Sequence, residues 1–209
     1  HIYYVKIKKT DQTYIERDLK ALIHLRDLNH FQKFVRLCAG RVGQIFNASA
    51  LASEVGVSVP TINSWLSILQ ESYVVFLLQP YYANIRKRLT KSPKLYFYDV
   101  GLAAYLLAIE NETQMRRDPL RGALFENMAM MELVKYRFNR GQDHNLYFFR
   151  DERHHEIDVV IKSSNTLTGV EIKSSATFHS DFLKWLKYFE KLFKSKVAKS
   201  VVIHAGDEH

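Results

Sequence analysis

The order of apolar and polar residues divides the chain into two patterned regions, separated by a polar break through Asp118 and Pro119. Apolar residues at three- and four-residue spacing indicate amphipathic helices, and short alternating or continuous apolar runs indicate strands. The predicted helices lie at residues 14–25, 29–39, 101–109, 120–138 and 180–193. The predicted strands lie at residues 73–78, 94–98, 146–149, 156–161, 170–173 and 198–204. This pattern predicts an α+β or α/β fold.

Two further short helices are predicted within residues 47–69. Ser49 can cap the first helix, Gly56 suits the left-handed turn that ends it, and Ser58 can cap the second helix. The buried stripe of the second helix consists of Ile62, Leu66 and Leu69. Short helices joined by a glycine-containing turn are typical of a helix-turn-helix. The two strands that follow predict a winged helix.

The wing of this motif would be the basic run at residues 86–94. Its candidate phosphate contacts are Arg86, Lys87, Arg88, Lys91 and Lys94. The second helix offers Thr61, Asn63 and Ser64 for base contacts. Because that helix carries no Lys or Arg, phosphate contact through the wing is better supported than sequence readout. A solvated charged face and a docking surface for a protein partner remain alternatives for the same residues.

The second region contains a hairpin with an unusual arrangement of charges. Side chains alternate faces along a strand, so Asp158 shares a face with Glu156, and Glu171 shares one with Lys173. A turn that is symmetric about residues 164–165 places Asp158 opposite Glu171, where like charges are destabilising. A cation between the two carboxylates would remove this conflict.

A helix with Glu126, a strand with Asp158 and a strand with Glu171 and Lys173 together resemble the PD-(D/E)XK nuclease arrangement. Asp158 and Glu171 are the expected ligands of Mg²⁺ or Mn²⁺, and the backbone carbonyl of Ile172 could add a third oxygen. Glu126 would reach in from its helix to a metal-bound water or a second ion. Lys173 would orient the attacking water or stabilise negative charge that develops during phosphodiester cleavage.

Two other interpretations of these residues remain open. Glu156 could pair with Lys173 across the hairpin while the other acids face solvent, although this leaves the opposed Asp158 and Glu171 unexplained. His154 and His155 could be metal ligands, although loop histidines are more often solvated. The sequence contains no Cys/His zinc spacing and no phosphate-binding loop of the Gly-x-x-x-x-Gly-Lys-[Ser/Thr] type, so ATP binding is not expected within it.

The bulk composition narrows the class of protein. The 209 residues are 47% hydrophobic, enough for real cores, and the net charge of +8 suits a polyanionic partner. The single cysteine, Cys38, lies in an amphipathic run and predicts a buried thiol in a reducing, cytoplasmic setting. No apolar run has the length of a membrane span. The start at His1 and the stop soon after an apolar run suggest a fragment of a longer protein.

The chain resembles a prokaryotic family of unknown function that forms the C-terminal part of AAA-type ATPases. The motifs that carry this resemblance occur in family order along nearly the whole chain. They are residues 61–66, 91–97, 99–102, 122–127, 156–158 and 170–175.

This resemblance implies three segments: a linker helix at 1–28 after an absent ATPase domain, a winged helix-turn-helix domain at 29–112, and a PD-(D/E)XK nuclease-like domain with a central mixed sheet at 113–209, truncated at its C-terminus. Glu126, Asp158, Glu171 and Lys173 fill the nuclease-like positions. ATP would bind only in the upstream domain. The resulting hypothesis is a Mg²⁺-dependent DNA phosphodiesterase coupled to an ATPase. The alternative is a catalytically silent adaptor that binds DNA or protein and regulates the ATPase, and an oligomer is compatible with either.

Overall fold

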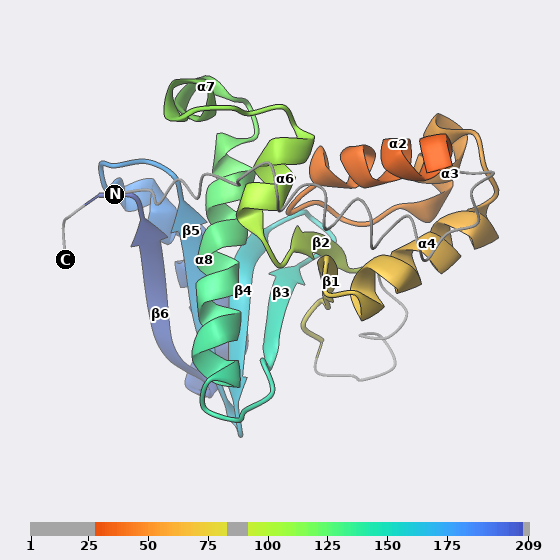
Figure 1. Cartoon of the computed structure of the whole chain (residues 1–209). Helices are drawn as coiled ribbons and strands as arrows, with labels where there is room; N and C mark the ends of the chain where they lie inside the picture. The colour runs from red at the N-terminus through yellow and green to blue at the C-terminus, as the bar shows by residue number, and fades with distance from the viewer. Residues whose placement is uncertain (1–27, 83–91, 207–209) are drawn as a thin grey trace. The chain divides into compact units, whose positions relative to one another are not determined.

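The structure of the chain is a computed structural model that describes residues 28–82 and 92–206 (Figure 1). It divides into two compact units, residues 1–77 with 95–120 and residues 78–94 with 121–209. Each unit is described by itself below. The helix predicted at 14–25 lies outside the described residues.

The first unit is mainly helical. Its helices are α2 (Leu28–Ala39), α3 (Ala48–Val55), α4 (Val59–Glu71), α6 (Val100–Leu106) and α7 (Glu112–Arg117). Strands β1 (Val75–Leu78) and β2 (Lys94–Phe97) pair in a two-stranded sheet. The sequence pattern missed α7 because its six residues bury no side chain and therefore show no apolar period.

The turn between α3 and α4 follows the predicted chemistry with one correction. Gly56 ends α3 at a φ of 91°, in the left-handed region, and its N–H donates to the Ala52 carbonyl. Ser58 caps α4 by accepting a hydrogen bond from the Thr61 N–H at 3.2 Å. The predicted cap at Ser49 is wrong: Asn47 caps α3 by accepting from the Ala50 N–H at 3.0 Å, so the helix begins earlier.

Aromatic side chains form the centre of the first unit. Phe31 and Phe34 of α2 are almost fully buried, and both rings pack against Trp65 of α4 at centroid distances of 5.4 and 5.8 Å. Cys38 is buried in the same helix, and this burial raises the pKa of its thiol to about 12. The predicted structural role of this cysteine agrees with its position.

The second unit contains a four-stranded sheet and two longer helices. Its elements follow the order α8 (Arg121–Phe138), β3 (Leu146–Arg150), β4 (Glu156–Ser163), β5 (Thr166–Lys173), α9 (Lys184–Phe193) and β6 (Val197–His204). The short 3₁₀ helices η2 (Ser180–Leu183) and η3 (Lys194–Lys196) flank α9. The strand order is β3-β4-β5-β6 with β6 parallel to β5 and the other neighbours antiparallel, so the sheet is mixed. The predicted mixture of helices and strands is confirmed.

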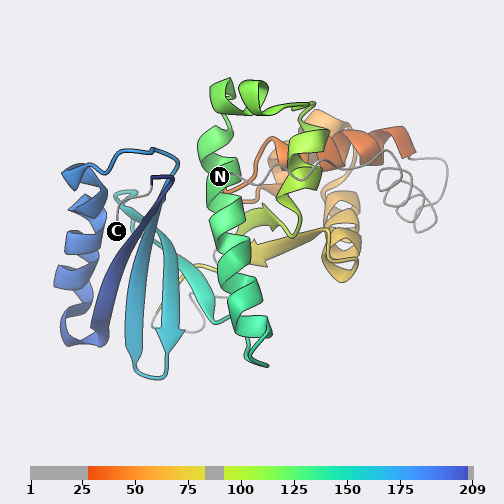
Figure 2. The same ribbon diagram turned by 60° about the vertical axis from the view of Figure 1, so that its left-hand side comes forward.

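The two helices lie on opposite faces of this sheet (Figure 2). Leu186 and Phe189 of α9 are buried in a cluster with Leu167 of β5. Gly169 of β5 lets α9 approach closely, since an added Cβ would lie 3.1 Å from Leu186 and 3.3 Å from Phe189. Leu124, Met130 and Val134 are among the buried residues of α8.

The register of the hairpin agrees with the sequence prediction. The pairs run from Ser163–Thr166 to Val159–Val170, which is symmetric about residues 164–165. On the other side of β4, the pairing with β3 changes register between Tyr147 and Phe149. Two residues of β4, at 158 and 159, therefore lie opposite one residue of β3, which is a β-bulge. A bulge changes the direction of the side chains in it, and this one contains the candidate site residue Asp158.

No helix among the described residues is long and apolar enough to cross a membrane.

Candidate functional site

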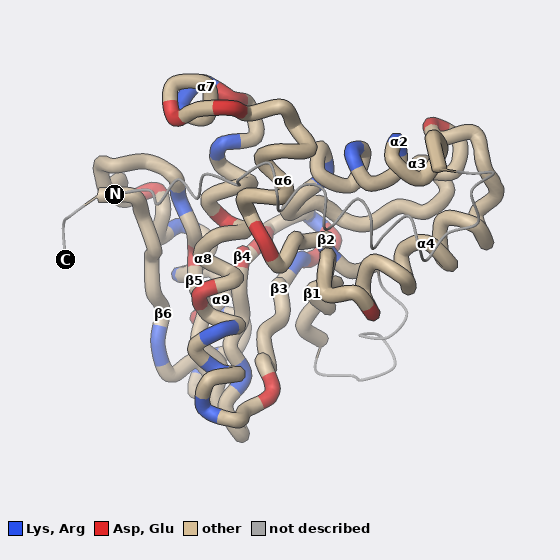
Figure 3. The backbone as a smooth tube through the Cα atoms, viewed as in Figure 1, with Lys and Arg blue, Asp and Glu red and all other residues tan. Residues whose placement is uncertain are grey.

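Three of the predicted site residues come together at the ends of β4 and β5. Lys173 places its Nζ 2.5 Å from Glu171 Oε1 and 3.7 Å from Asp158 Oδ2. The two carboxylates therefore converge on one ammonium group, as the hairpin register predicts. Figure 3 marks the acidic and basic positions along β4, β5 and α8.

A backbone hydrogen bond from β5 fixes the carboxylate of Asp158. Beyond Val159–Val170 the described β4–β5 pairs end, and the Ile172 N–H instead donates to Asp158 Oδ2 at 2.7 Å. A side chain thus replaces a strand–strand hydrogen bond. Asp158 is only 8% exposed, and burial raises its pKa, although the charges of Lys173 and Lys94 oppose that shift.

Glu171 is a second buried acid of the group, next to Asp158. Its side chain is buried, and Oε2 has no hydrogen-bond partner among the described residues. Burial and the neighbouring charge of Asp158 raise the pKa of Glu171 to about 7, against a stabilising contribution from Lys173. A buried acceptor without a donor is costly, and a carboxylate oxygen of this kind can accept a hydrogen bond or ligate a cation.

Lys173 retains its charge despite partial burial. Desolvation lowers the pKa of its ammonium, but Asp158 and Glu171 outweigh this effect and raise it. The group is therefore cationic across the physiological pH range. A fixed cation beside two acids can stabilise additional negative charge at this place.

Glu126 lies on α8, as predicted, and it is paired with a lysine. Lys94 Nζ lies 3.4 Å from Glu126 Oε1 and 2.5 Å from Glu156 Oε1. The sequence interpretation assigned Lys94 to an exposed basic wing. The structure instead leaves it only 3% exposed, because Lys94 begins β2 and its ammonium is enclosed by acids.

The alternative salt bridge between Glu156 and Lys173 does not match the structure. Glu156 pairs with Lys94 and, at 3.6 Å, with Arg150 Nε, whereas Lys173 pairs with Asp158 and Glu171. Each lysine therefore makes its ion pairs with a different pair of acids, although the charge of Lys94 also acts on Asp158.

The predicted three-carboxylate metal set is not assembled. Among residues 28–82 and 92–206, no three His, Cys, Asp or Glu side chains are placed together so that they could hold a metal ion. Glu126 has the ammonium of Lys94 beside it, although the charge of Glu126 also acts on Glu171 and Lys173. The oxygens that remain for a cation are those of Asp158 and Glu171, with the Ile172 carbonyl from the same strand. Hard divalent cations prefer such oxygens, and the unpartnered Glu171 Oε2 fits one.

The two histidines before β4 have other partners. His154 Nδ1 lies 2.8 Å from Arg150 Nη2, and His155 Nδ1 lies 2.8 Å from Asp151 Oδ2. The His155 ring also stacks on Trp185 of α9 at 4.4 Å. These contacts fasten the loop between β3 and β4, and they account for both histidines without a metal.

The candidate nucleic-acid residues of α4 have different exposures. Asn63 and Ser64 are exposed on the helix, whereas Thr61 is half-buried and its hydroxyl lies 2.8 Å from the Ser58 hydroxyl in the helix cap. Arg86, Lys87, Arg88 and Lys91 lie outside the described residues.

Sequence reasoning missed the place of Lys94 in the acidic site. The available signal was local: Lys94 stands directly before the apolar run Leu95–Phe97, unlike the basic residues at 86–88. A lysine at the start of a buried strand needs an acidic partner, because a buried ammonium is otherwise unstable.

Comparisons with known proteins agree in outline with the two-part organisation. The family described as "Domain of unknown function (DUF8612)" matches residues 4–113, and "Domain of unknown function (DUF4143)" matches residues 121–209. The chain is 32% identical over 165 residues to "Uncharacterized protein Mb2031c" of Mycobacterium bovis and to "Uncharacterized protein Rv2008c" of Mycobacterium tuberculosis. The matched part is 79% of this chain but 36% of each relative. No solved structure gave a significant match.

The DUF8612 match covers more than half of the chain, and the DUF4143 match covers most of the rest, including the acidic site. The chain therefore belongs to the DUF8612 family.

Proposed function

We propose that the second unit is a divalent-cation-dependent DNA phosphodiesterase of the PD-(D/E)XK type. The observation that carries this proposal is the convergence of Asp158, Glu171 and Lys173, with Glu171 Oε2 buried and without a hydrogen-bond partner among the described residues. A structural ion-pair set would be expected to satisfy its buried oxygens.

The order of elements supports the same proposal. Helix α8 carries Glu126, β4 carries Asp158, and β5 carries Glu171 and Lys173, which is the arrangement that the nuclease resemblance implies. The helix that follows β5 covers the opposite face of the sheet from α8 (Figure 2). Because one fold can host many activities, the proposed activity is inferred from the side chains of the site.

Mg²⁺ or Mn²⁺ would be held by the carboxylates of Asp158 and Glu171 and the carbonyl of Ile172. When bound, such an ion supplies an activated water and neutralises charge on the phosphoryl group. Lys173 contributes a fixed positive charge beside that water and the phosphoryl oxygens. The Ile172 N–H keeps Asp158 in place through its 2.7 Å hydrogen bond.

The chain would also bind nucleic acid outside this site. Helices α3 and α4 with the strands β1 and β2 would act as the predicted winged helix, and the basic residues at 86–91, between the two strands, would contact phosphates. The relatives are much longer than this chain, which is compatible with an ATPase domain upstream in a cytoplasmic protein.

The test is cleavage of duplex, branched and single-stranded DNA in the presence of Mg²⁺ or Mn²⁺. Glu171→Ala and Lys173→Ala should each lower the cleavage rate by roughly 100-fold or more, since each removes a group that acts on developing charge. The exposed Glu152 offers a matched control, and Glu152→Gln should leave the rate unchanged.

Cleavage that survives both site substitutions would exclude these residues as the active site. DNA binding that weakens with salt but never leads to cleavage would instead favour the silent adaptor that regulates an ATPase.

A further inference from the structure

Lys94 is a buried cation in the acidic site that the proposed chemistry does not use. It is the first residue of β2, far from the hairpin in sequence, yet it belongs to the second unit with α8 and β4. Burying a lysine side chain to 3% exposure is rare without strong partners.

The partners of Lys94 come from two elements. Its Nζ lies 2.5 Å from Glu156 Oε1 on β4 and 3.4 Å from Glu126 Oε1 on α8, and 5.5 Å from the centre of the Phe148 ring on β3. Burial opposes its charge, but Glu126 and Glu156 outweigh that effect and raise the pKa of the ammonium. Lys94 therefore remains charged and holds α8 to the sheet at this point.

The site contains more acidic than basic groups. Four carboxylates, those of Glu126, Glu156, Asp158 and Glu171, face the two ammonium groups of Lys94 and Lys173. With all four carboxylates ionised, these six groups carry two excess negative charges. Arg150, which pairs with Glu156 at the more exposed rim, reduces this excess to one, so the site remains acidic.

Without Lys94, Glu126 and Glu156 would form a second pair of facing acids. Paired carboxylates from a helix and a strand are the kind of oxygen site that a second divalent ion occupies in two-metal centres. The ammonium of Lys94 occupies that place, and unlike a bound metal ion it is covalently attached to the protein.

We propose that Lys94 is a built-in cation that excludes a second divalent ion from between Glu126 and Glu156, so that the site takes a single ion on Asp158 and Glu171. This inference rests on the proposed cation site but not on DNA cleavage. Lys94 is a positioning residue that sets the number of ions through its contacts with Glu126 and Glu156.

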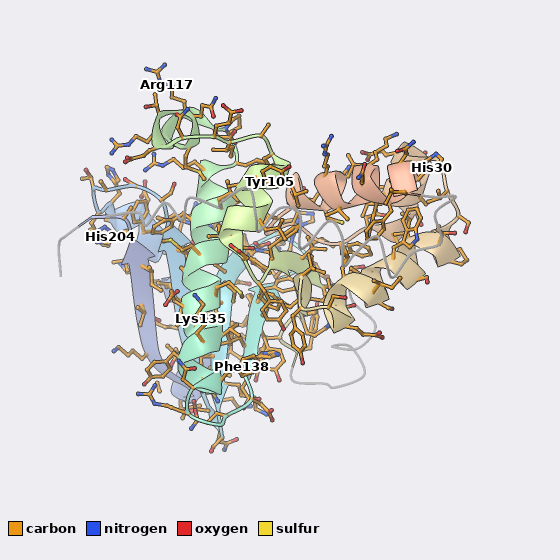
Figure 4. All side chains as sticks on the ribbon, viewed as in Figure 1. His30, Tyr105, Arg117, Lys135, Phe138 and His204 are labelled. Atoms are coloured by element: carbon orange, nitrogen blue, oxygen red, sulfur yellow. The ribbon has the colours of Figure 1, made fainter. Side chains whose placement is uncertain are left out.

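The test is titration of the chain with Mn²⁺, with bound ions counted directly. The wild type should bind one ion, and Lys94→Met should bind one more. Lys94→Met/Glu126→Gln should return to the wild-type number, because the second pair of acids is broken. Lys135 on α8 is the matched control (Figure 4): it is exposed and pairs with Glu132 at 2.8 Å, so Lys135→Met should not change the count.

Equal ion counts in the wild type and Lys94→Met would overturn the inference while leaving the cleavage proposal intact. Two ions on the wild type would also overturn it. No ion on either protein would remove the cation site of the proposed function as well. If Lys94→Met is unfolded without metal, recovery of cooperative unfolding by Mn²⁺, and not by NaCl of equal ionic strength, supports the inference; failure to fold at any Mn²⁺ concentration contradicts it.

Discussion

At the scale of single residues, Glu171 links the stability of the second unit to the chemistry of the site. Its carboxyl group is buried next to Asp158, which raises its pKa to about 7, and one of its oxygens has no hydrogen-bond partner among the described residues. A proton and a divalent cation therefore compete for the same group near neutral pH. The acid is held in place by the fold at the expense of stability, as is common at functional sites.

The raised pKa of Glu171 predicts that the stability of the second unit depends on pH in the absence of divalent cations. The folded pKa of about 7 exceeds the ordinary 4.5, so the native state binds the proton more tightly. Stability should thus fall as the pH rises from about 4.5 to about 7, by up to about 3 kcal/mol, and then level off. Glu171→Gln should lack this fall.

The measurement is chemical denaturation of both proteins between about pH 5 and pH 8. A Trp65→Phe background leaves Trp185 as the fluorescent reporter of the second unit. A wild-type minus variant difference that is independent of pH would contradict the prediction.

Among the secondary-structure elements, the features that depend on residues close together in sequence were predictable. Turn symmetry gave the hairpin register, and Gly56 and Ser58 marked the turn before α4. The bulge at residues 158–159 and the burial of Lys94 were not predictable, because both depend on contacts with β3 and α8 that are distant in sequence. Helix α7 was missed for lack of any buried face.

The turn between α3 and α4 makes a prediction about the first unit. Gly56 has a φ of 91°, which costs an L-residue about 1–2 kcal/mol, so Gly56→Ala should lower the free energy of unfolding by about that amount. Gly40 lacks such a φ, and an added Cβ there meets only ordinary contacts of 3.6 Å or more, so Gly40→Ala is the control. Trp65 fluorescence during denaturation reports on this unit. Equal losses in both variants would show that the left-handed conformation is not the cause.

At the scale of the whole molecule, the chain combines a helical unit that carries a helix–turn–helix-like pair with a mixed-sheet unit that carries the acidic site. The net charge of +8 suits a polyanionic partner, whereas the site itself is acidic, and the proposed chemistry on a phosphate would need a cation there. A divalent ion at Asp158 and Glu171 would reconcile these two properties. The proposed function therefore depends most on whether a divalent ion binds to Asp158 and Glu171.

The most direct measurement is anomalous X-ray scattering from a crystal of the chain soaked in Mn²⁺ above the Glu171 pKa of about 7. The account predicts a single anomalous peak in the second unit, ligated by the carboxylates of Asp158 and Glu171 and the carbonyl of Ile172, and absent from Glu171→Gln. No peak there at saturating Mn²⁺, or a peak that persists in Glu171→Gln, would contradict it.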